Sequence, residues 1–414
     1  MKYIVILGDG MADYPVPQLG NKTPLQYAKK PNMDYMASHG IMGLVKTIPE
    51  GLAPGSDVAN LSVMGYDPCK YYTGRSPLEA ISMGIDLGAN DVAFRCNLVT
   101  LSDENDYSEK CMIDYSSDEI STEESAQLIE TLNDQLELPD INFYPGVSYR
   151  HCMVWRNAPH DYILTPPHDI SGKKIKEYLP KGKDAGILLQ LMQKSYEILK
   201  PHEVNIDRVK RGLRPANSIW FWGDGTKPSL PSFYEKYHLK GSVISAVDLV
   251  KGLGICIGLK PVNVEGATGN FNTNYKGKAE AALEELKSGQ DFVYIHVEAP
   301  DECGHRYEIE NKVSSIELID RHIVGRLLKG LEEIGEYKIL LLPDHPTPLS
   351  VRTHTAEPVP FIIYSPHSMQ NLLLNTTGNI IQHTHASSYD EIEAKKSGIF
   401  IESGHSLMDL FIKG

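Results

Sequence analysis

Three short segments rich in Val, Ile and Leu each lead into an aspartate, namely Asp9, Asp301 and Asp344. The length and composition of these segments predict buried β-strands. In a mostly parallel sheet the carboxyl ends of the strands meet at one edge, so the three aspartates are expected to gather there. Gathered carboxylates repel one another unless a cation holds them. One aspartate after a strand is usually a loop or N-cap residue, whereas three in equivalent positions indicate a metal site.

Histidines accompany two of these aspartates. His305 follows Asp301 by four residues, a spacing that places both on one face of a helical turn. His345 is adjacent to Asp344, and His354 follows nine residues later. A mixture of carboxylate and imidazole suits Mn²⁺ or Zn²⁺ better than Ca²⁺, with Mg²⁺ and Co²⁺ left open. The Asp-x-x-x-His spacing alone is common by chance, but the complete set is much less so.

Ser56 is the candidate nucleophile. It follows a Pro54-Gly55 turn and precedes Asp57–Met64, which reads as a helix that ends at Gly65. A serine at a helix N-terminus is most often only an N-cap. Here, however, free N–H groups and the helix dipole would favour a phosphate, and a cation beside the hydroxyl would favour its ionisation. The sequence therefore predicts that Ser56 carries a phosphoryl group.

Composition and charge limit the classes of function. The chain has 414 residues, 41% of them hydrophobic and 23% charged, which is typical of a soluble protein of two or three domains. Its net charge of −14 argues against nucleic-acid and anionic-membrane partners. The six cysteines form no Cys-x-x-Cys pair, and a strand begins almost at once, which leaves no room for a signal peptide. We therefore expect a reduced, cytoplasmic protein without a transmembrane segment.

The hydrophobic pattern predicts an interrupted α/β domain. Residues 1–90 and 216–414 alternate strand-like and helix-period segments, and we assign the strand-like segment Ser218–Trp222 to this domain. Residues 91–215 are more polar and acidic and are predicted to form an inserted α+β cap domain that moves against the first domain. Within the cap, Ser121–Glu124 reads as a capping box before a helix.

A longer helix is predicted over Val313–Leu331. Its apolar residues recur near helical spacing, and Glu317 and Arg321 are four residues apart, as in a helical ion pair. We also considered the pair of histidines at His383 and His385 as a metal site. Because the surrounding stretch is rich in Asn, Gln, Thr and Ser, we interpret it as a loop instead.

Seven stretches of the sequence together resemble the archaeal-type, cofactor-independent (2,3-bisphosphoglycerate-independent) phosphoglycerate mutases of the alkaline phosphatase superfamily. They span most of the chain in order, so the resemblance is specific. The stretches are Gly8–Met11, Pro54–Asp57 with Asn60, Tyr72–Ala80, Ile244–Gly252, Glu298–His305, Pro343–His345 and His354–Phe361.

The resemblance implies an alkaline-phosphatase-like, mostly parallel sheet flanked by helices, interrupted by the cap. It implies an isomerase of glycolysis and gluconeogenesis that interconverts 3-phosphoglycerate and 2-phosphoglycerate, a small phosphorylated anion, through phosphorylated Ser56. It also implies two divalent metal ions, most simply Mn²⁺, held by Asp9, Ser56, Asp344 and His345 and by Asp301, His305 and His354. Contacts to substrate phosphate, carboxylate and hydroxyl groups are carried over to Arg75, Arg150, His151, His168, Asp169 and Lys251.

Two other activities stay open at the level of sequence. The aromatic stretch Asn217–Gly225 is similar to a bacterial branch of the family that has been proposed to phosphorylate homoserine in threonine biosynthesis. The chain contains no Gly-x-x-x-x-Gly-Lys-Ser/Thr phosphate loop, so a kinase activity would have to pass through the phosphoserine. A phosphomonoester hydrolase would use water as the acceptor. A non-catalytic binding protein is disfavoured because the ligand set is complete, and the oligomeric state is not predicted.

Overall fold

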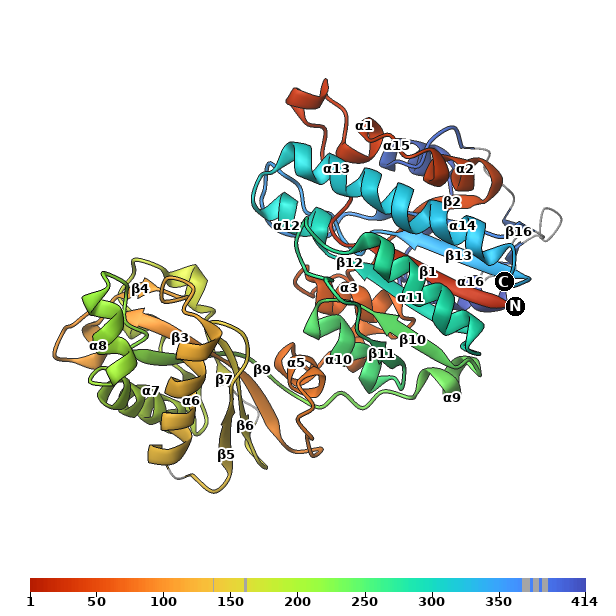
Figure 1. The fold of residues 1–414 in the computed structure, drawn as a ribbon. Coiled ribbons are helices and arrows are strands. Elements are labelled where there is room, and N and C mark those ends of the chain that lie inside the picture. The colour runs from red at the N-terminus through yellow and green to blue at the C-terminus, as the bar shows by residue number, and fades with distance from the viewer. Residues whose placement is uncertain (137, 160–161, 367–372, 375–379, 382–385) are drawn as a thin grey trace. The chain divides into compact units, whose positions relative to one another are not determined.

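The computed structural model describes residues 1–136, 138–159, 162–366, 373–374, 380–381 and 386–414. The chain forms two compact units (Figure 1). The first comprises Met1–Tyr72 and Ser229–Gly414, and the second comprises Thr73–Pro228. No helix among the described residues is long and apolar enough to cross a bilayer.

The first unit is built on a sheet of eight strands. Their order is β11 (Lys260–Val262), β10 (Gly241–Ile244), β12 (Phe292–Val297), β1 (Lys2–Gly8), β13 (Tyr337–Leu342), β14 (Val359–Tyr364), β2 (Ile41–Val45) and β17 (Phe400–Ile401). Only β14 runs antiparallel to its two neighbours, and the remaining pairs are parallel. The mostly parallel sheet expected from the sequence is confirmed. Because β1, β12 and β13 are parallel neighbours, their carboxyl ends lie at the same edge.

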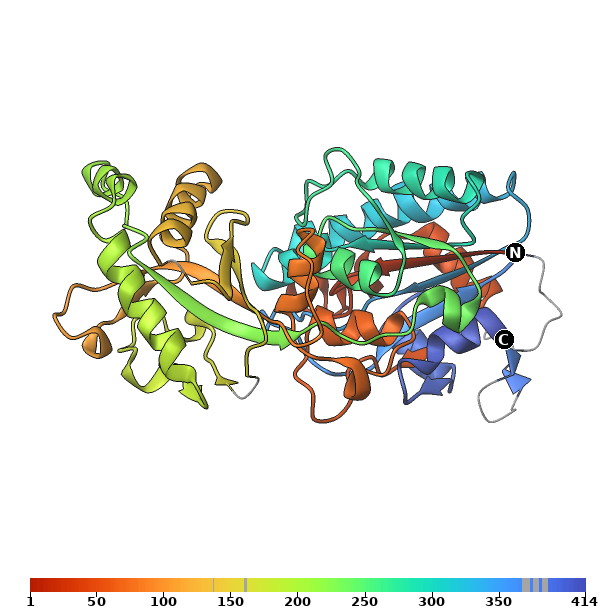
Figure 2. The same cartoon turned by 90° about the horizontal axis from the view of Figure 1, so that it is seen from below.

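Helices cover both faces of this sheet (Figure 2). The side chains that alternate along the strands pack on one face against α2 (Pro31–His39), α11 (Tyr275–Lys287), α13 (Ile309–Ile319) and α14 (Gly325–Leu331). The other face carries α3 (Ser56–Val63), α10 (Asp248–Cys256) and α16 (Ser406–Lys413). Both sides of the central strands are therefore buried, which agrees with their continuous apolar sequences.

The long helix predicted over Val313–Leu331 is interrupted. Helix α13 passes through a π-helical turn, η5 (Asp320–Val324), before it continues as α14. The carboxylate of Asp320 is buried at this turn and accepts hydrogen bonds from the backbone of Met33 at 2.7 Å and from Asn32 at 2.8 Å. The sequence pattern has no signal for a π turn, because these contacts to α2 are remote in sequence.

The second unit contains a five-stranded antiparallel sheet. Its path is β4 (Met112–Asp114), β3 (Val92–Leu101), β6 (Arg150–Trp155) and β5 (Ile141–Tyr144), and β9 (Ser218–Thr226) also pairs with β3. The main helices are α5 (Ser76–Ser82), α6 (Thr122–Leu136), α7 (Ala185–Leu199) and α8 (Glu203–Lys210). At the start of α6, Ser121 accepts a hydrogen bond from the backbone N–H of Glu124 at 3.2 Å, which is one half of the predicted capping box, whereas the Glu124 carboxylate pairs with Arg208 and Arg211.

The boundaries of the second unit differ from those read off the sequence. We expected the insert to span 91–215, whereas the compact unit also contains residues 73–90 and 216–228. The assignment of Ser218–Trp222 to the first domain was wrong, because β9 pairs along β3 from Val99 to Val92. Composition alone could not assign Ser218–Trp222 to a domain, since a buried strand has the same apolar character in either sheet.

The remaining elements are short. In the first unit they are η1 (Pro17–Leu19), α1 (Pro24–Tyr27), α4 (Pro68–Tyr71), α9 (Phe233–Tyr237), α12 (Ala299–His305), β15 (Leu373–Leu374), β16 (Ile380–Ile381) and α15 (Glu391–Lys396). In the second unit they are η2 (Tyr107–Glu109), β7 (Tyr162–Ile163), η3 (Pro167–Ile170), η4 (Lys176–Tyr178) and β8 (Lys181–Gly182).

Candidate metal centre

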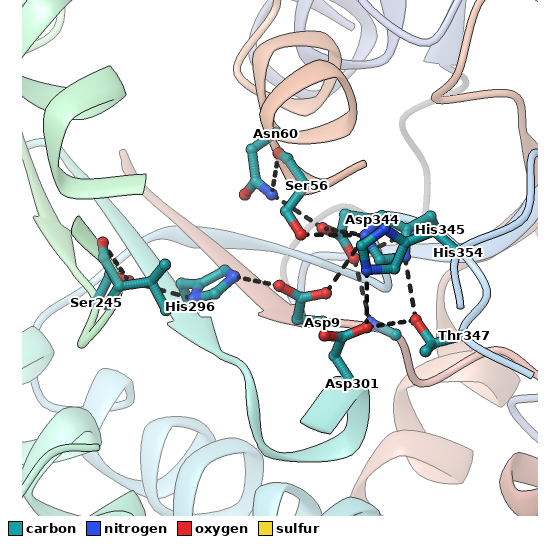
Figure 3. Close-up of polar contacts among 12 residues, drawn as sticks. Asp9, Ser56, Asn60, Ser245, His296, Asp301, Asp344, His345, Thr347 and His354 are labelled. Carbon is teal, nitrogen blue, oxygen red and sulfur yellow. Dashed lines mark hydrogen bonds and ion pairs between the residues drawn. The ribbon is translucent and has the colours of Figure 1, made fainter. Parts of the chain in front are cut away.

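The three aspartates meet at the carboxyl edge of the first unit's sheet (Figure 3). Asp9 follows β1, Asp301 lies in α12 just after β12, and Asp344 follows β13. Their exposed fractions are 1%, 4% and 0%. Burial, followed by the neighbouring charges of Asp344 and Asp301, raises the pKa of Asp9 well above its usual range. Three buried carboxylates in one place are stable together only with protons or cations between them.

A glycine allows these strand ends to approach one another. Gly10 has a φ of +62°, and a Cβ built on it would lie 2.7 Å from the Cα of Asp301 and 2.6 Å from the hydroxyl oxygen of Thr347. Its backbone N–H donates to a carboxylate oxygen of Asp344 at 3.2 Å. A larger residue would therefore be strained and would push the loop after β1 away from α12.

Asp301, His305 and His354 form one group of possible metal ligands. The Nε2 atoms of His305 and His354 lie 3.2 and 3.4 Å from the two carboxylate oxygens of Asp301, and 3.0 Å from each other. Nδ1 of His305 lies 3.0 Å from the carbonyl oxygen of Arg352. That oxygen can only accept, so Nδ1 carries a proton and the lone pair of the neutral ring lies on Nε2. This is the tautomer that binds a cation.

The pKa values in this group follow from the same contacts. Burial acts to raise the pKa of Asp301, but hydrogen bonds from His305 and His354 outweigh it and hold the pKa well below its usual range. Burial acts to lower the pKa of His305, but Asp301 outweighs it and raises the pKa to about 9. A proton and a divalent cation would therefore compete for the same space between these three side chains.

His345 joins Ser56 to the carboxylates. Its Nε2 lies 3.1 Å from the hydroxyl oxygen of Ser56, 3.6 Å from Oδ1 of Asp9 and 3.5 Å from Oδ2 of Asp344. The ring is completely buried, and burial lowers its pKa. A neutral imidazole therefore faces two carboxylates and the serine that the sequence singled out.

Asn60 fixes the serine relative to the carboxylates. Its side-chain NH₂ donates to the carbonyl oxygen of Ser56 at 2.8 Å and to Oδ2 of Asp344 at 2.9 Å. Its oxygen accepts from the hydroxyl of Tyr294 at 2.7 Å. Asn60 lies one turn after Ser56 in α3, so the first turn of the helix is tied directly to the end of β13.

His296 is a member of the cluster that the sequence analysis missed. Its Nε2 lies 2.9 Å from Oδ2 of Asp9, and its Nδ1 lies 3.2 Å from the hydroxyl of Ser245. Burial lowers the pKa of His296 to about 3, so the ring is neutral. A polar residue inside an apolar strand was the available signal, but the partner follows only from the pairing of β12 with β1, in which Leu7 lies opposite His296.

The donor atoms fit divalent cations. Oδ1 of Asp9 is buried and makes no hydrogen bond among the described residues. Possible ligand atoms lie within 4.8 Å of one another in three overlapping groups, which are Asp301, His305 and His354; Asp9, Asp301 and His345; and Asp9, His296 and Asp344. Carboxylate oxygens and imidazole nitrogens in this ratio suit Mn²⁺ or Zn²⁺. The structure thus brings all seven ligands predicted from the sequence into one region.

The candidate substrate contacts lie mostly in the second unit, where Arg75 contacts the half-buried Glu79. Glu79 pairs with Nε of Arg75 at 2.8 Å and with Nε of Arg95 at 3.1 Å. Burial acts to raise the pKa of Glu79, but Arg95 and Arg75 outweigh it and lower the pKa, with a smaller contribution from Arg150. Three arginines around one glutamate leave an excess of positive charge. Sequence analysis missed Arg95, because its partners are distant in the sequence.

Aromatic rings support this cationic cluster. The guanidinium of Arg95 lies 4.4 Å from the ring centre of Trp222, and the ring of His168 lies edge-on to Trp222 at 5.3 Å. Arg150 is exposed and stacks over Tyr149 at 4.5 Å. The aromatic stretch that includes Trp222 therefore positions cations within the second unit.

Three of the predicted substrate contacts, His151, Asp169 and Lys251, lie in positions less suited to binding a substrate. His151 is buried within β6, where it accepts from the backbone N–H of Gly146 at 3.0 Å, and burial lowers its pKa to about 3. Asp169 is exposed and lies 3.7 Å from His168. Lys251 is half-buried in α10 of the first unit. The two histidines interpreted as a loop, His383 and His385, lie outside the described residues.

Comparisons with known proteins show the family of the chain. The profile of the family described as 2,3-bisphosphoglycerate-independent phosphoglycerate mutase matches residues 37–205. The 2,3-bisphosphoglycerate-independent phosphoglycerate mutase of Methanothrix thermoacetophila is 51% identical over 415 residues, covering 100% of both chains. The chain belongs to this mutase family. The resemblance inferred from the sequence motifs is thereby confirmed.

Solved structures show the same fold as this mutase-family chain. The PH0037 protein from Pyrococcus horikoshii superposes with a TM-score of 0.80 at 32% identity, covering 100% of this chain and 98% of that one. The cofactor-independent phosphoglycerate mutase from Thermoplasma acidophilum gives a TM-score of 0.64 at 26% identity, covering 100% and 99%. The predicted α/β architecture of the mutase is confirmed.

Proposed function

We propose that the chain is a phosphoglycerate mutase that interconverts 3-phosphoglycerate and 2-phosphoglycerate through a phosphoserine at Ser56. The observation that carries this proposal is the position of Ser56. Its hydroxyl lies 3.1 Å from His345 within the cluster of buried carboxylates, at the first position of α3. The whole-chain identity to a named mutase favours this reaction over homoserine phosphorylation and over phosphomonoester hydrolysis.

Two divalent cations would complete the site. We assign one to Asp9, Ser56, Asp344 and His345 and the other to Asp301, His305 and His354, with Mn²⁺ as the first choice. When bound, such cations neutralise phosphate oxygens and favour the ionised form of a serine hydroxyl. We give His296 the role of orienting Asp9, because its Nε2 lies 2.9 Å from Oδ2 of Asp9 and its Nδ1 lies 3.2 Å from the hydroxyl of Ser245.

The first half of the reaction moves the phosphoryl group to the protein. The Ser56 hydroxyl loses its proton as its oxygen attacks phosphorus, the new Oγ–P bond forms, and the bond between phosphorus and the substrate oxygen breaks. The freed glycerate oxygen takes up a proton. Asn60 holds the carbonyl of Ser56 against Asp344, so the hydroxyl is fixed before the substrate arrives. The first N–H groups of α3 favour the negative charge on the transferred group.

The second half returns the group to the other hydroxyl of the same glycerate. That hydroxyl loses its proton and attacks the phosphoserine, the Oγ–P bond of Ser56 breaks, and the freed Ser56 oxygen takes up a proton. The reaction needs no second substrate, because the product is an isomer of the substrate and differs from it only in which oxygen carries the phosphoryl group. Glycerate must stay bound between the two steps, and water must be excluded, since hydrolysis of the phosphoserine would make the enzyme a phosphatase.

We assign retention of glycerate to the cationic cluster of the second unit. Arg75, Arg95 and Arg150 surround Glu79 with excess positive charge, which suits the carboxylate and phosphate of the substrate. His168 and Asp169 adjoin this cluster and remain candidates for hydroxyl contacts. His151 is too buried for direct contact, so we assign it to the packing of β6. In this proposal the second unit acts as the mobile cap.

Product analysis tests the proposed reaction. Protein loaded with Mn²⁺ and given 3-phosphoglycerate should form 2-phosphoglycerate with little free phosphate, and added homoserine should remain unphosphorylated. Ser56→Ala should lower turnover by about 10³-fold or more. The matched control is Ser62→Ala in the same helix, whose hydroxyl is buried and makes no hydrogen bond among the described residues. Phosphate as the main product would identify a hydrolase, and phosphohomoserine would identify a kinase.

A further inference from the structure

A basic groove lies on the outer surface of the first unit, between α11 and the segment formed by η5 and α14. Figure 1 shows these helices side by side, and they are in contact along their length. The groove has a volume of about 540 Å³. It is lined by Asn32, Lys276, Leu283, Lys287, Arg321, His322, Gly325, Arg326, Lys329, Gly330 and Glu333. Five lysines and arginines among these residues make the groove strongly cationic.

Helical spacing explains why the cations face the same groove. Arg321, Gly325 and Lys329 recur every four residues, so they form one row along η5 and α14, and Glu333 follows just after α14 ends. His322, Arg326 and Gly330 form the adjacent row, and Lys276, Leu283 and Lys287 face them from α11. The π turn sets where these rows point, because Asp320 is directed inward to Asn32 while the next residue, Arg321, is exposed. π turns are frequent at functional sites.

Most of this positive charge is not neutralised by neighbouring residues. Glu280 pairs with Arg326 at 2.7 Å and with Lys276 at 3.8 Å. The residues Lys287, Arg321 and Lys329 are exposed, and their side chains form no ion pair or hydrogen bond within the described residues. The ion pair expected between Glu317 and Arg321 does not form, and Glu317 instead accepts from the backbone of Lys29 at 2.9 Å.

This concentration of positive charge is unusual for the chain, whose net charge is −14. Cations held close together repel one another, so the cluster carries a cost in stability that a bound anion would remove. The groove is shaped by backbone as well as by side chains. At its floor, a Cβ added to Gly330 would lie 2.5 Å from Leu283, and one added to Gly325 would lie 2.9 Å from Asn32.

The groove is separate from the candidate metal centre within the same unit. The helical segment begins at Ile309, just after α12 at the carboxyl edge of the sheet, and ends at Leu331, shortly before β13 starts at the opposite edge. The groove residues of η5 and α14 occupy its second half, near the amino edge, and Lys287 ends α11 at that edge, whereas Lys276 lies in the first turn of α11. The Ser56 cluster lies at the carboxyl edge, so an anion in the groove would not occupy the catalytic site.

We propose that this basic groove binds a small phosphate-bearing anion, at a second site distinct from the metal centre. The volume is that of a small-molecule site, for which about 300–1,000 Å³ is usual. Arg321 and Arg326 present planar guanidinium groups that match phosphate oxygens in pairs, and Lys287 and Lys329 supply point charges. The proposal does not depend on the catalytic reaction, because none of these residues belongs to the proposed active site.

Inorganic phosphate is the probe for this site. Binding is measured by equilibrium dialysis of the metal-loaded protein with labelled phosphate at constant ionic strength. The wild type should bind one phosphate per chain more than the double variant Arg321→Gln/Lys329→Gln. Binding at the metal centre is common to both proteins and cancels in the difference. We expect the variant to weaken the additional site at least about tenfold, because two charge-assisted contacts are lost.

A matched control removes the same charge elsewhere. Lys22 and Lys395 are exposed residues of the first unit whose side chains have no ion pair in the described structure. Lys22→Gln/Lys395→Gln should bind phosphate as the wild type does. The proposal is overturned if the wild type shows no additional phosphate at millimolar concentration, or if both double variants lose binding equally. A changed oligomeric state with unchanged phosphate binding would assign the groove to protein association and would also overturn it.

Discussion

The carboxyl group of Glu391 is predicted to make the stability of the first unit depend on pH near neutrality. Burial raises its pKa to about 7, with a smaller contribution from Asp390. One oxygen accepts from the backbone N–H of Asp13 at 3.1 Å, and the other accepts from the hydroxyl of Thr23 at 2.7 Å. These two hydrogen bonds favour the charged form, but they do not offset the loss of hydration.

The sign and size of the effect of Glu391 on stability follow from its pKa in the unfolded and in the folded chain. The unfolded chain ionises near the reference value of 4.5, whereas the folded chain ionises near 7. Glu391 therefore favours folding fully below pH 4.5, and this contribution is lost as the pH rises through 7. A difference of about 2.5 pKa units corresponds to at most about 3 kcal/mol. The side chain keeps some exposure, so we expect about 2 kcal/mol.

The variant Glu391→Gln tests this reasoning. Its amide can still accept from Asp13 and reach Thr23, but it carries no charge. The free energy of unfolding of the first unit, measured in urea, should rise by about 2 kcal/mol at pH 8 and stay unchanged at pH 4.5. Glu393→Gln in the same helix is the control. Lys396 holds the pKa of Glu393 below its usual range, so this variant should bring no gain. Equal effects of Glu391→Gln at both pH values would refute the argument.

Three further outcomes are expected. Removal of metal with a chelator should lower the unfolding temperature of the first unit and leave it folded, since each cation at 100 times its dissociation constant contributes about 2.7 kcal/mol. An unchanged temperature on adding Mn²⁺ back would contradict the two-metal assignment. His296→Gln should weaken Mn²⁺ binding about 10–100-fold, as measured by competition with a fluorescent chelator, because Asp9 loses its orienting partner; unchanged affinity would leave His296 a packing residue only. Arg75→Gln should raise the KM for 3-phosphoglycerate about tenfold with a smaller change in kcat, and an unchanged KM in steady-state assays would remove Arg75 from the substrate site.

Much of the candidate metal centre could be predicted because its residues follow local signals. Asp9, Asp301 and Asp344 each come directly after a strand-like segment, and parallel pairing of β1 with both β12 and β13 is enough to bring them together. His305 and His345 are close in sequence to these aspartates. The fold class followed from the same alternation of strands and helices.

The parts that could not be predicted depend on contacts between distant segments. His296 acquires its role only from the register of β12 against β1. Arg95 is an isolated arginine within a strand until Glu79 and Trp222 are placed beside it. The π turn depends on the burial of Asp320 against α2 in the same way. These features require knowledge of tertiary packing, which overrides local sequence preference.

The central claim, that Ser56 carries the phosphoryl group, is tested most directly by trapping it. Protein loaded with Mn²⁺ and mixed with 3-phosphoglycerate should be quenched in acid within milliseconds, and its peptides should be examined by mass spectrometry. We predict one added phosphoryl group on Ser56, absent from Ser56→Ala and present in Ser62→Ala. Rapid formation of 2-phosphoglycerate by Ser56→Ala, or an adduct on another residue with Ser56 unmodified, would contradict the account.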